Sequence, residues 1–493
     1  MVNQVEQFDV AIIGHGPVGC SLANILGQFD VSTIILDKEA SGYRLPRACS
    51  FDDEVMRVFQ TMGLAGRVCE IAEVGGSAHF VDSEGKALVT WLRPKSLSPN
   101  NWSVNYRFHQ PDLENILREG LKRYVCVTTR WGSDVTGLTQ DEYGTTLRYN
   151  KIASDEQCEL RATYVVGCDG AHSFTRSCMN SGIEDLGFRE SWLIIDLLLK
   201  TPETEPTGET LHYCEEARSG SSVFVGSKRK RWEFRLKPSD NREEIRKPKN
   251  VWQLIERWIG PDQADLERTA IYTFHSTIAE KWRQGRLFIA GDAAHQTPPF
   301  MGQGMCAGIR DAANLGWKLE RVLKQSAPAT LLDTYQSERR PHVKAFIELT
   351  IQMGQMINQT TSAIIAGNVT DPADGPQKLT TLKPTLGPGL SGGQTKWHGH
   401  LFPQPRLQSG ELLDDKIGTR PALILRPEFR RHLSAESDNN INTRKFAVID
   451  DASTGLQDWF DSTAVNAVLI RPDRYIFGTA SSDSEVQELL RFV

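Results

Sequence analysis

The residues best suited to chemistry form a glycine-rich motif near the N-terminus. Gly14, Gly16 and Gly19 have the spacing of a loop that binds the phosphates of a dinucleotide. The first glycine allows a tight turn, the second lets a phosphate approach the backbone, and the third lets a helix pack closely on a strand. An apolar strand over residues 8–13 precedes the motif and a helix over 17–26 follows it, so its first N–H groups would face the phosphates. The pattern predicts a nucleotide site rather than a plain turn.

An acidic residue completes this unit. Residues 32–36 are typical of a second parallel strand, which ends at Asp37. A carboxylate there could bind the hydroxyl groups of a ribose, with Glu39 as the alternative. The residues beside these positions that we also expect to border the nucleotide are Pro17, Val18 and Lys38.

Two later motifs indicate that the nucleotide is surrounded from several directions. Asp169 and Gly170 follow an apolar run in mid-chain, and Gly291 and Asp292 follow another. Asp292 could accept hydrogen bonds from the sugar-alcohol chain of a flavin, although aspartate also favours the start of a helix. Three such motifs in this order suit FAD best, so we interpret the chain as a flavoprotein.

A turn rich in proline and glycine leads from the last motif into a helix after residue 304. The N–H groups of Met305 and Cys306 would point at whatever lies before that helix. A reduced flavin is anionic along one edge, so a helix N-terminus there would stabilise it. The turn therefore adds these residues to the expected cofactor site: Pro299, Gly302, Gly304, Met305 and Cys306. We interpret Cys306 and Cys49 as small buried hydrophobes, not as reactive thiols.

The composition and net charge narrow the class of protein to which the chain can belong. The 493 residues carry a net charge of −6 and are 39% hydrophobic, which favours a globular protein of several domains and argues against a nucleic-acid surface. The basic run 228–231 is interpreted as a charged hairpin turn. Nine scattered cysteines without a Cys-x-x-Cys pair argue against disulfides and metal sites. With no signal peptide or membrane span, a cytoplasmic location is expected.

The rest of the chain divides by its patterns. Helices are expected over 53–64 and from Gln110, short antiparallel strands between about 185 and 280, and helices from 304 to about 365. Residues 370–393 read as a linker. A small α/β unit follows, with strands at 446–449, 467–470 and 475–478 and helices at 455–460 and from Ser484.

The order of these motifs resembles the class A FAD-dependent aromatic hydroxylases with the p-hydroxybenzoate hydroxylase fold, most closely the 3-(3-hydroxyphenyl)propionate hydroxylases. The similarity covers nearly the whole chain, and the segments that carry it are 45–48, 51–57, 231–234, 272–275 and 302–305. It implies an α/β fold: a Rossmann-like FAD-binding domain with an inserted antiparallel sheet and a thioredoxin-like C-terminal domain. The implied boundaries are 1–184 (with a substrate region around 75–110), 185–283 for the substrate sheet, 284–369, the linker 370–393, and 394–493.

The resemblance also assigns roles to single residues. It implies that Arg47 and Gln110 contact the ribose or phosphates of FAD. Asp169 would bridge the FAD and nicotinamide sites, and Asp292 would hold the ribitol. Arg176 would support the loop of Asp169, with a surface salt bridge as the equal alternative. The C-terminal domain, lacking Cys-x-x-Cys, would be structural and could support a homodimer.

The implied activity is that of a monooxygenase. NADH or NADPH reduces FAD, O2 adds to form a C4a-hydroperoxide, and its distal oxygen attacks a phenolic or related aromatic ring. Candidate substrate residues are His212 and Tyr213 in one strand, Tyr272 and His275 in a strand facing it, and Arg189 for a carboxylate. Open alternatives are a Baeyer–Villiger or polyketide-tailoring oxygenase and, more distantly, a non-catalytic flavin-binding scaffold.

Overall fold

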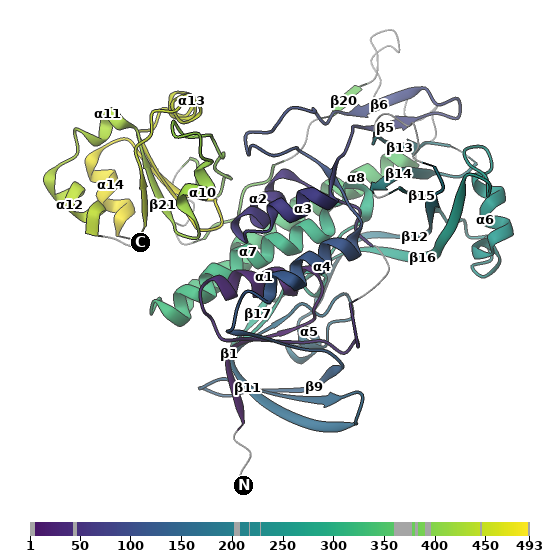
Figure 1. Ribbon diagram of the computed structural model, residues 1–493, viewed down its shortest axis with the longest axis horizontal. Helices are drawn as coiled ribbons and strands as arrows, with labels where there is room; N and C mark the ends of the chain where they lie inside the picture. Colours follow the sequence, from purple (N-terminus) through teal and green to yellow (C-terminus); the bar gives the residue numbers. More distant parts are fainter. Residues whose placement is uncertain are drawn as a thin grey trace.

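A computed structural model of the protein describes residues 5–42, 47–201, 208–215, 217–226, 228–358, 377–379, 383–389, 396–443 and 446–491. Most of the expected linker, the expected helix beyond 358, and residues 45 and 46 of the motif at 45–48 lie outside these ranges. The described chain forms two large sheets, a helical layer between them and a C-terminal α/β unit (Figure 1).

A parallel sheet positions the glycine motifs. Its parallel strands have the order β18-β11-β1-β2-β8, with β17 antiparallel at one edge and an antiparallel ribbon of β10 and β9 continuing from β11. The bounds are Glu6–Ile13 (β1), Thr33–Leu36 (β2), Val127–Arg130 (β8), Ser133–Gln140 (β9), Thr145–Lys151 (β10), Glu156–Gly167 (β11), Arg283–Gln284 (β17) and Leu287–Ile289 (β18). The carboxyl ends of parallel strands share one edge, so the loops after β1, β2, β11 and β18 meet there.

Helices cover this sheet. Nine of the twelve residues of α1 (Pro17–Gln28) are buried, and the helix packs against α4 (Gln110–Leu121) and α7 (Gln303–Lys324). Pro17 and Pro111 lie in first turns, where a missing N–H costs nothing. The other helices of this part are α2 (Asp53–Thr61), α3 (Ala65–Ile71), α5 (Phe174–Cys178) and α8 (Thr334–Asn358).

The second sheet has nine strands in the order β19-β16-β12-β15-β14-β13-β5-β6-β20. Most neighbours are antiparallel, but β13 with β5 and β6 with β20 are parallel. The bounds are Ala78–Val81 (β5), Ala87–Trp91 (β6), Ile183–Leu199 (β12), Thr210–Tyr213 (β13), Gly220–Gly226 (β14), Arg229–Arg235 (β15), Ala264–Ala279 (β16), His295–Gln296 (β19) and Gln377–Leu379 (β20). A small third sheet pairs β7 (Tyr106–Arg107) with β3 (Ser50–Phe51) and β4 (Glu73–Val74).

The two faces of the nine-stranded sheet have different neighbours. Its inner face, with Trp192 and Ile194, packs on Phe300, Met301 and α8. Its outer face, with Leu193 and Ile195, packs on α6 (Pro248–Ile255). Alternate residues of one strand therefore belong to different cores.

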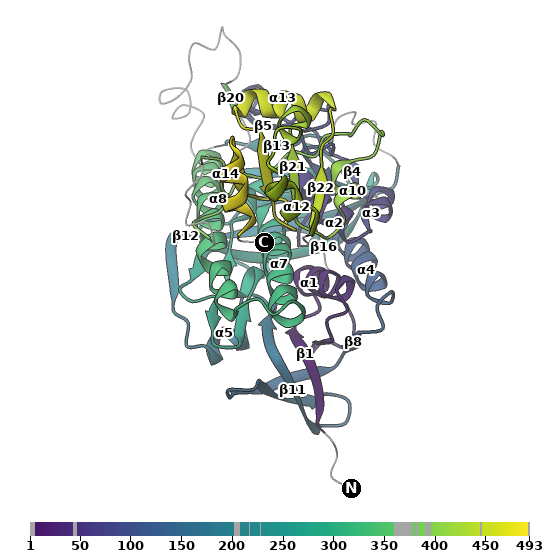
Figure 2. The ribbon, with the colours of Figure 1, turned by 90° about the vertical axis from the view of Figure 1, so that its left-hand side faces the viewer.

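The C-terminal unit has a four-stranded sheet of order β22-β21-β23-β24. Its elements are α10 (Leu413–Ile417), β21 (Ala422–Leu425), α11 (Pro427–Arg430), α12 (Ala435–Thr443), β22 (Ala447–Ile449), α13 (Thr454–Thr463), β23 (Ala467–Ile470), β24 (Ile476–Ala480) and α14 (Asp483–Leu490). The unit lies beside α2 and α7 (Figures 1 and 2). Buried Arg57 of α2 reaches Asp414 of α10 at 2.8 Å.

One expectation about the second sheet was wrong. The basic run 228–231 is not simply a charged turn, because β15 begins at Arg229 and only Lys228 remains in the hairpin. Arg231 is buried and pairs with Asp196 of β12, with Nε 2.6 Å from Oδ1. The basic run therefore supplies a buried, ion-paired arginine to the sheet.

Candidate active site

The loop after β1 is shaped by its glycines. Gly14 has φ +107°, and a Cβ there would lie 2.3 Å from the carbonyl oxygen of Cys168. A Cβ on Gly19 would lie 2.1 Å from the carbonyl oxygen of Gly14. No atom lies within 4 Å of a Cβ built on Gly16. The first and third positions are thus closed by protein, while the second faces open space where a ligand can approach the backbone.

Asp37 lies at the end of β2, beside this loop. Its two carboxylate oxygens accept the backbone N–H groups of His15 at 2.7 Å and Glu39 at 2.8 Å. His15 is buried in edge contact with Trp131, and burial followed by the charge of Arg118 lowers its pKa to about 4. Asp37 therefore holds the loop in place, and its oxygens keep further lone pairs for a ribose.

The second motif is joined to the third. Asp169 accepts hydrogen bonds from Ser173 Oγ at 2.5 Å and from the N–H of Thr175 at 2.9 Å. Arg176 donates to the carbonyl oxygens of Ala171 and Ala293, both at 2.8 Å. Within the described ranges Arg176 forms no salt bridge and instead ties the loop of Asp169 to Ala293, the residue after Asp292.

The third motif packs closely on the first. Gly291 has φ +63°, and a Cβ there would lie 2.9 Å from Val18; one on Gly308 of α7 would lie 2.5 Å from the same side chain. Asp292 next to it is exposed to solvent, yet burial among protein atoms raises its carboxyl pKa, against the opposing charges of His295 and Arg47. A side chain that lines a recess can be reached by solvent and still be surrounded by protein atoms, as Asp292 is.

Helix α7 begins directly after a left-handed residue, Gly302, at φ +65°. A Cβ there would lie 2.2 Å from Ser50 Oγ, whereas no atom lies within 4 Å of a Cβ on Gly304. The thiol of Cys306 is fully buried, donates to the carbonyl oxygen of Gly302, and has its pKa raised by burial. Cys306 is therefore part of the packing of the helix start.

Exposure divides the expected cofactor residues into two groups. Gly19, Gln110, Gly291 and Cys306 are buried and support the backbone. The accessible group, in order along the chain, is Gly14, Gly16, Pro17, Val18, Asp37, Lys38, Arg47, Asp169, Asp292, Pro299, Gly302, Gly304 and Met305. Accessible backbone at the carboxyl edge of a parallel sheet, two open glycines and a recessed carboxylate fit an extended dinucleotide such as FAD.

Gln110 supports the segment that contains Arg47 rather than offering its amide outward. Its Oε1 accepts the N–H groups of Arg47 at 2.8 Å and Ala48 at 2.7 Å, and its Nε2 donates to Glu114 at 2.7 Å. Arg231 of β15 donates to the carbonyl oxygen of Arg47 at 2.9 Å. The segment of Arg47 is thereby held by α4 on one side and by β15 on the other.

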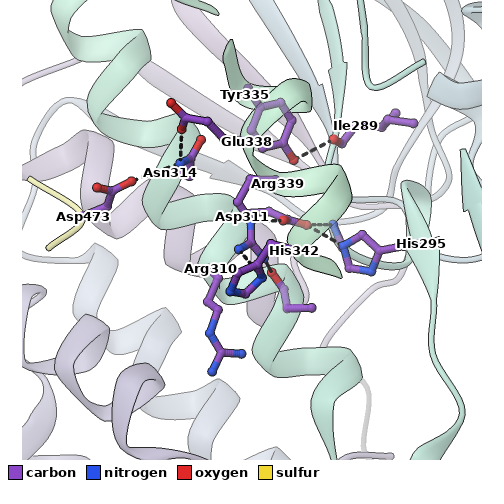
Figure 3. Close-up of polar contacts among 12 residues, drawn as sticks. Ile289, His295, Arg310, Asp311, Asn314, Tyr335, Glu338, Arg339, His342 and Asp473 are labelled. Atoms are coloured by element: carbon purple, nitrogen blue, oxygen red, sulfur yellow. Dashed lines mark hydrogen bonds and ion pairs between the residues drawn. The ribbon is translucent and has the colours of Figure 1, made fainter. Parts of the chain in front are cut away.

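A buried carboxylate behind the third motif was missed in the sequence. Asp311 of α7 accepts from the N–H of Gly291 at 3.1 Å, from His295 Nε2 at 2.6 Å and from Arg339 Nε at 2.9 Å (Figure 3). Burial alone would raise the pKa of Asp311, but His295 and Arg339 hold it below its usual value. No local motif marks Asp311, because its partners come from two segments outside α7, residues 291–295 and α8.

The network continues into the C-terminal unit. Arg339 Nη1 contacts His342 Nδ1 at 2.9 Å, and His342 Nε2 lies 3.3 Å from the hydroxyl of Tyr475. That hydroxyl donates to Glu54 at 2.6 Å, and Glu54 accepts from Arg310 Nε at 2.6 Å. A continuous polar chain thus links the loop of Asp292 with Tyr475.

The four expected substrate residues do not form one cluster. β13 and β16 lie in the same sheet with three other strands between them, so they do not face each other. Tyr272 pairs with Trp192 on the inner face, and His212 stacks on Phe80 there at 4.8 Å. Tyr213 packs on Trp258 at 4.8 Å, which places it on the outer face.

His275 also lies on the outer face. It pairs in register with Arg189, three residues from the inward-facing Tyr272. The physical reason is the two-residue period of a strand, which separates adjacent candidates onto opposite faces. His212 and Tyr272 remain on the face that packs against Phe300 and Met301.

The environment of His212 does not suit a general base. Its Nδ1 lies 2.8 Å from Ser221 Oγ, while its Nε2 has no partner among the described residues. Burial, followed by the charges of Arg93 and Arg107, lowers its pKa to about 3. The imidazole is neutral near pH 7 and can position a hydroxyl group, but it is a weak base.

Comparisons with known proteins identify the family. The FAD binding domain model matches residues 7–350, and the HcaD C-terminal domain model matches 425–492. The chain belongs to this family of FAD-binding proteins. The match confirms FAD as the cofactor and, together with the relatives below, the predicted class of FAD-dependent monooxygenase.

Its relatives are similar over nearly their full lengths. A probable NADH-specific resorcinol 4-hydroxylase of Rhodococcus jostii (strain RHA1) is 34% identical, over 98% of this chain and 94% of the relative. A 3-(3-hydroxy-phenyl)propionate/3-hydroxycinnamic acid hydroxylase of Mycobacterium avium (strain 104) is 31% identical, over 95% and 89%. The resemblance stated from the sequence is confirmed.

Solved structures show the same fold. The flavin-dependent monooxygenase PieE, in complex with FAD and substrate, has a TM-score of 0.81 at 20% identity and covers 98% of each chain. Aklavinone-11 hydroxylase, in complex with FAD and aklavinone, has a TM-score of 0.79 at 21% identity and covers 99% of each chain. At this identity the likeness concerns the fold alone.

The described ranges contain neither a candidate membrane-spanning helix nor a candidate metal-binding cluster. No helix there is long and apolar enough to cross a membrane. Within those same ranges, no group of three or more histidine, cysteine, aspartate or glutamate side chains could hold a metal ion.

Proposed function

We propose that this protein hydroxylates a small phenolic ring, with NADH as the reductant. The observation that carries this proposal is the placement of Arg107, beside Ser50 and the start of α7, at the same corner of the inner face as His212. The full-length similarity to a resorcinol hydroxylase and to hydroxyphenylpropionate hydroxylases supports a phenolic substrate.

Each side of the site has its own task in this proposal. Bound FAD accepts the hydride and activates O2. The loop after β1 and Arg47 would bind its phosphates, Asp292 would accept a hydrogen bond from its ribitol, and the N–H groups of Met305 and Cys306 would stabilise its reduced ring. Apolar side chains of the inner face, such as Trp192 and Phe300, exclude water from the substrate.

The polar inner-face groups orient the substrate. His212 Nε2 is placed to contact a ring hydroxyl, and the hydroxyl of Tyr272, 3.2 Å from Arg268 Nη1, lies on the same face. Tyr213, His275 and Arg189 have no part in this proposal, because they lie on the outer face. Asp169, held by α5, would border the nicotinamide.

We further propose that the C-terminal unit is a thioredoxin-like domain with a structural role. Its central strand β21 pairs parallel with β22 and antiparallel with β23, and no cysteine occurs after Cys306. Buried ion pairs attach it to α2 and α8, including Arg471 Nη1 with Glu338 at 2.8 Å. The cytoplasmic location and a homodimer stay predictions.

The test is oxidation of NADH and of NADPH by the FAD-loaded protein across a panel of phenols, with hydrogen peroxide measured in parallel. We expect a small phenol to accelerate NADH oxidation with little peroxide and to yield a product heavier by one oxygen atom. Acceleration with stoichiometric peroxide would contradict hydroxylation of that ring. A panel without any accelerating phenol would favour a polyketide-tailoring or Baeyer–Villiger reaction.

A further inference from the structure

Two arginines converge at the N-terminal end of β13. Arg107 of β7 donates through Nη2 to the hydroxyl of Thr210, the first residue of that strand. Arg93 donates its backbone N–H to Ser77 Oγ at 3.1 Å, and the carbonyl oxygen of Ser77 accepts the N–H of Thr210 at 3.0 Å. Both arginines therefore belong to one corner of the sheet.

Neither guanidinium has an acidic partner. Among the residues that the structure describes, no carboxylate oxygen lies within 4.0 Å of the side chains of Arg93 or Arg107. Arg93 Nη1 and Arg107 Nε are buried without a hydrogen-bond partner, and the Arg93 guanidinium lies 4.4 Å from the ring centre of Trp91. Burial, followed by the charge of Arg107, lowers the pKa of Arg93 to about 9. A buried charge without an opposite charge beside it destabilises the folded state.

The neighbouring arginines are different. Arg231 and Arg268 share Asp196, with N–O distances of 2.6 and 2.8 Å. The carboxylate whose charge acts on the pKa of Arg107 is Glu233, which lies 3.8 Å from Arg231 and whose own pKa is raised by burial. His212 faces the same pair and is neutral. Positive charge at Arg93 and Arg107 is therefore left uncompensated by the described chain.

This corner adjoins the cofactor site. Arg107 pairs in register with Ser50, whose Oγ packs against Gly302 at the start of α7. Burial raises the pKa of the Cys49 thiol, next to Ser50, and the charges of Arg231 and Arg107 oppose that rise. A group bound by Arg107 would thus lie beside the segment that leads to the flavin edge.

We propose that Arg93 and Arg107 bind an anionic oxygen of the aromatic substrate, with His212 Nε2 beside them. The inference rests on the proposed function and names the substrate class: a phenol that carries a carboxylate, or a phenol bound as its phenolate. A guanidinium matches both oxygens of a carboxylate, and positive charge also favours ionisation of a phenol. Ionisation would make the ring more electron-rich.

The test measures binding apart from turnover. The FAD-loaded protein and its Arg93→Gln variant are titrated with 3-(3-hydroxyphenyl)propionate, with 3-ethylphenol as its neutral counterpart, and with benzoate, each followed by the visible absorption of bound flavin. If the carboxylate is the bound anion, the variant should bind the propionate and benzoate about 10- to 100-fold more weakly and 3-ethylphenol within about twofold. If the phenolate is bound, both phenols should weaken and the pH at which bound 3-ethylphenol ionises should rise.

Two controls keep the outcome clear. Arg189→Gln, on the outer face, should leave all three affinities unchanged, whereas a loss there instead of in Arg93→Gln would overturn the proposal. Because no carboxylate of the described residues pairs with Arg93, its replacement leaves no described acid unpaired and should keep or raise the free energy of unfolding. Arg107→Lys keeps the positive charge but loses the paired N–H donors of the guanidinium, so it should weaken binding of a carboxylate more than binding of a phenolate.

Failure of the anion site and failure of the proposed function would give different results. Unchanged affinities of all three ligands in a folded, FAD-loaded Arg93→Gln variant would overturn the anion site, even if phenols are hydroxylated. Benzoate binding that depends on Arg93, in a protein that hydroxylates no phenol, would support the anion site and overturn the proposed function.

Discussion

The cofactor side and the substrate side of this site are built differently. Around the glycine loops, the carboxylates have partners: buried Asp311 binds three groups, and the partly accessible Asp169 is held by Ser173 and Thr175. Beside Thr210 of the nine-stranded sheet, no carboxylate of the described residues pairs with Arg93 or Arg107. On the first side, binding and folding depend on the same contacts. On the second, a binding group exists at a cost to stability.

The largest expected effect tests the closed backbone of the cofactor side. Gly14→Ala should prevent folding or destabilise the protein by more than about 3 kcal/mol, because its Cβ would meet the carbonyl oxygen of Cys168 and its φ is positive. The matched control is Gly16→Ala, whose Cβ meets nothing within 4 Å. Urea unfolding and FAD content should show a folded Gly16→Ala protein with weakened FAD binding. Equal stability of the two variants would contradict the comparison.

The next effect tests the ion pairs behind the cofactor loops. Glu338 binds Lys318 Nζ at 2.7 Å and Arg471 Nη1 at 2.8 Å. Burial would raise its pKa, but these charges hold the pKa at about 2. Since the folded pKa lies below the unfolded value of about 4.3, the stabilisation is complete above that pH and is lost as pH falls towards 2.

The variant Glu338→Gln should therefore lose about 3 kcal/mol of unfolding free energy at pH 7, because Lys318 loses its carboxylate and Arg471 keeps only Asp473 among the described carboxylates. Its unfolding free energy should also fall less steeply than that of the wild type between about pH 4.5 and 2. Lys318 is protonated throughout this window and adds no slope. Parallel pH profiles of the two proteins would show that Glu338 does not titrate in this range.

A smaller effect separates cofactor binding from folding. Asp292→Ala should bind FAD about 10- to 100-fold more weakly, because the ribitol loses its acceptor. The free energy of unfolding of the apoprotein should change by less than about 0.5 kcal/mol, since this exposed carboxylate binds no other group among the described residues. Unchanged FAD occupancy in the purified variant would count against the proposed contact.

The smallest effect concerns the substrate side. His212→Gln removes the imidazole that lies on Phe80 and contacts Ser221. We expect the KM for a phenol to rise about 3- to 10-fold, with kcat changed less, because the group positions the substrate and is too weak a base to remove a proton. The pH dependence of kcat should stay that of the wild type. A pH profile that loses a limb in the variant would restore His212 as the base.

Short-range patterns predicted much of the fold. The expected strand over 32–36 and helix from Pro17 agree closely with β2 and α1, and the strand over 467–470 coincides with β23. β21 was missed, and although the resemblance implied a substrate region around 75–110, the strands β5 and β6 within it were not predicted. Their partners lie far away in sequence, so no local pattern assigns them to that sheet.

The amino-acid sequence by itself determined the cofactor side, because a glycine that must take a positive φ or let a phosphate approach leaves a local trace in its spacing. Only the tertiary structure decided the substrate side. It separated Tyr213 and His275 from His212 and Tyr272, since neighbouring residues of a strand face opposite ways. It also brought Asp311 to the third motif and Arg93 to Arg107, because burial and charge pairing depend on segments that meet only after folding.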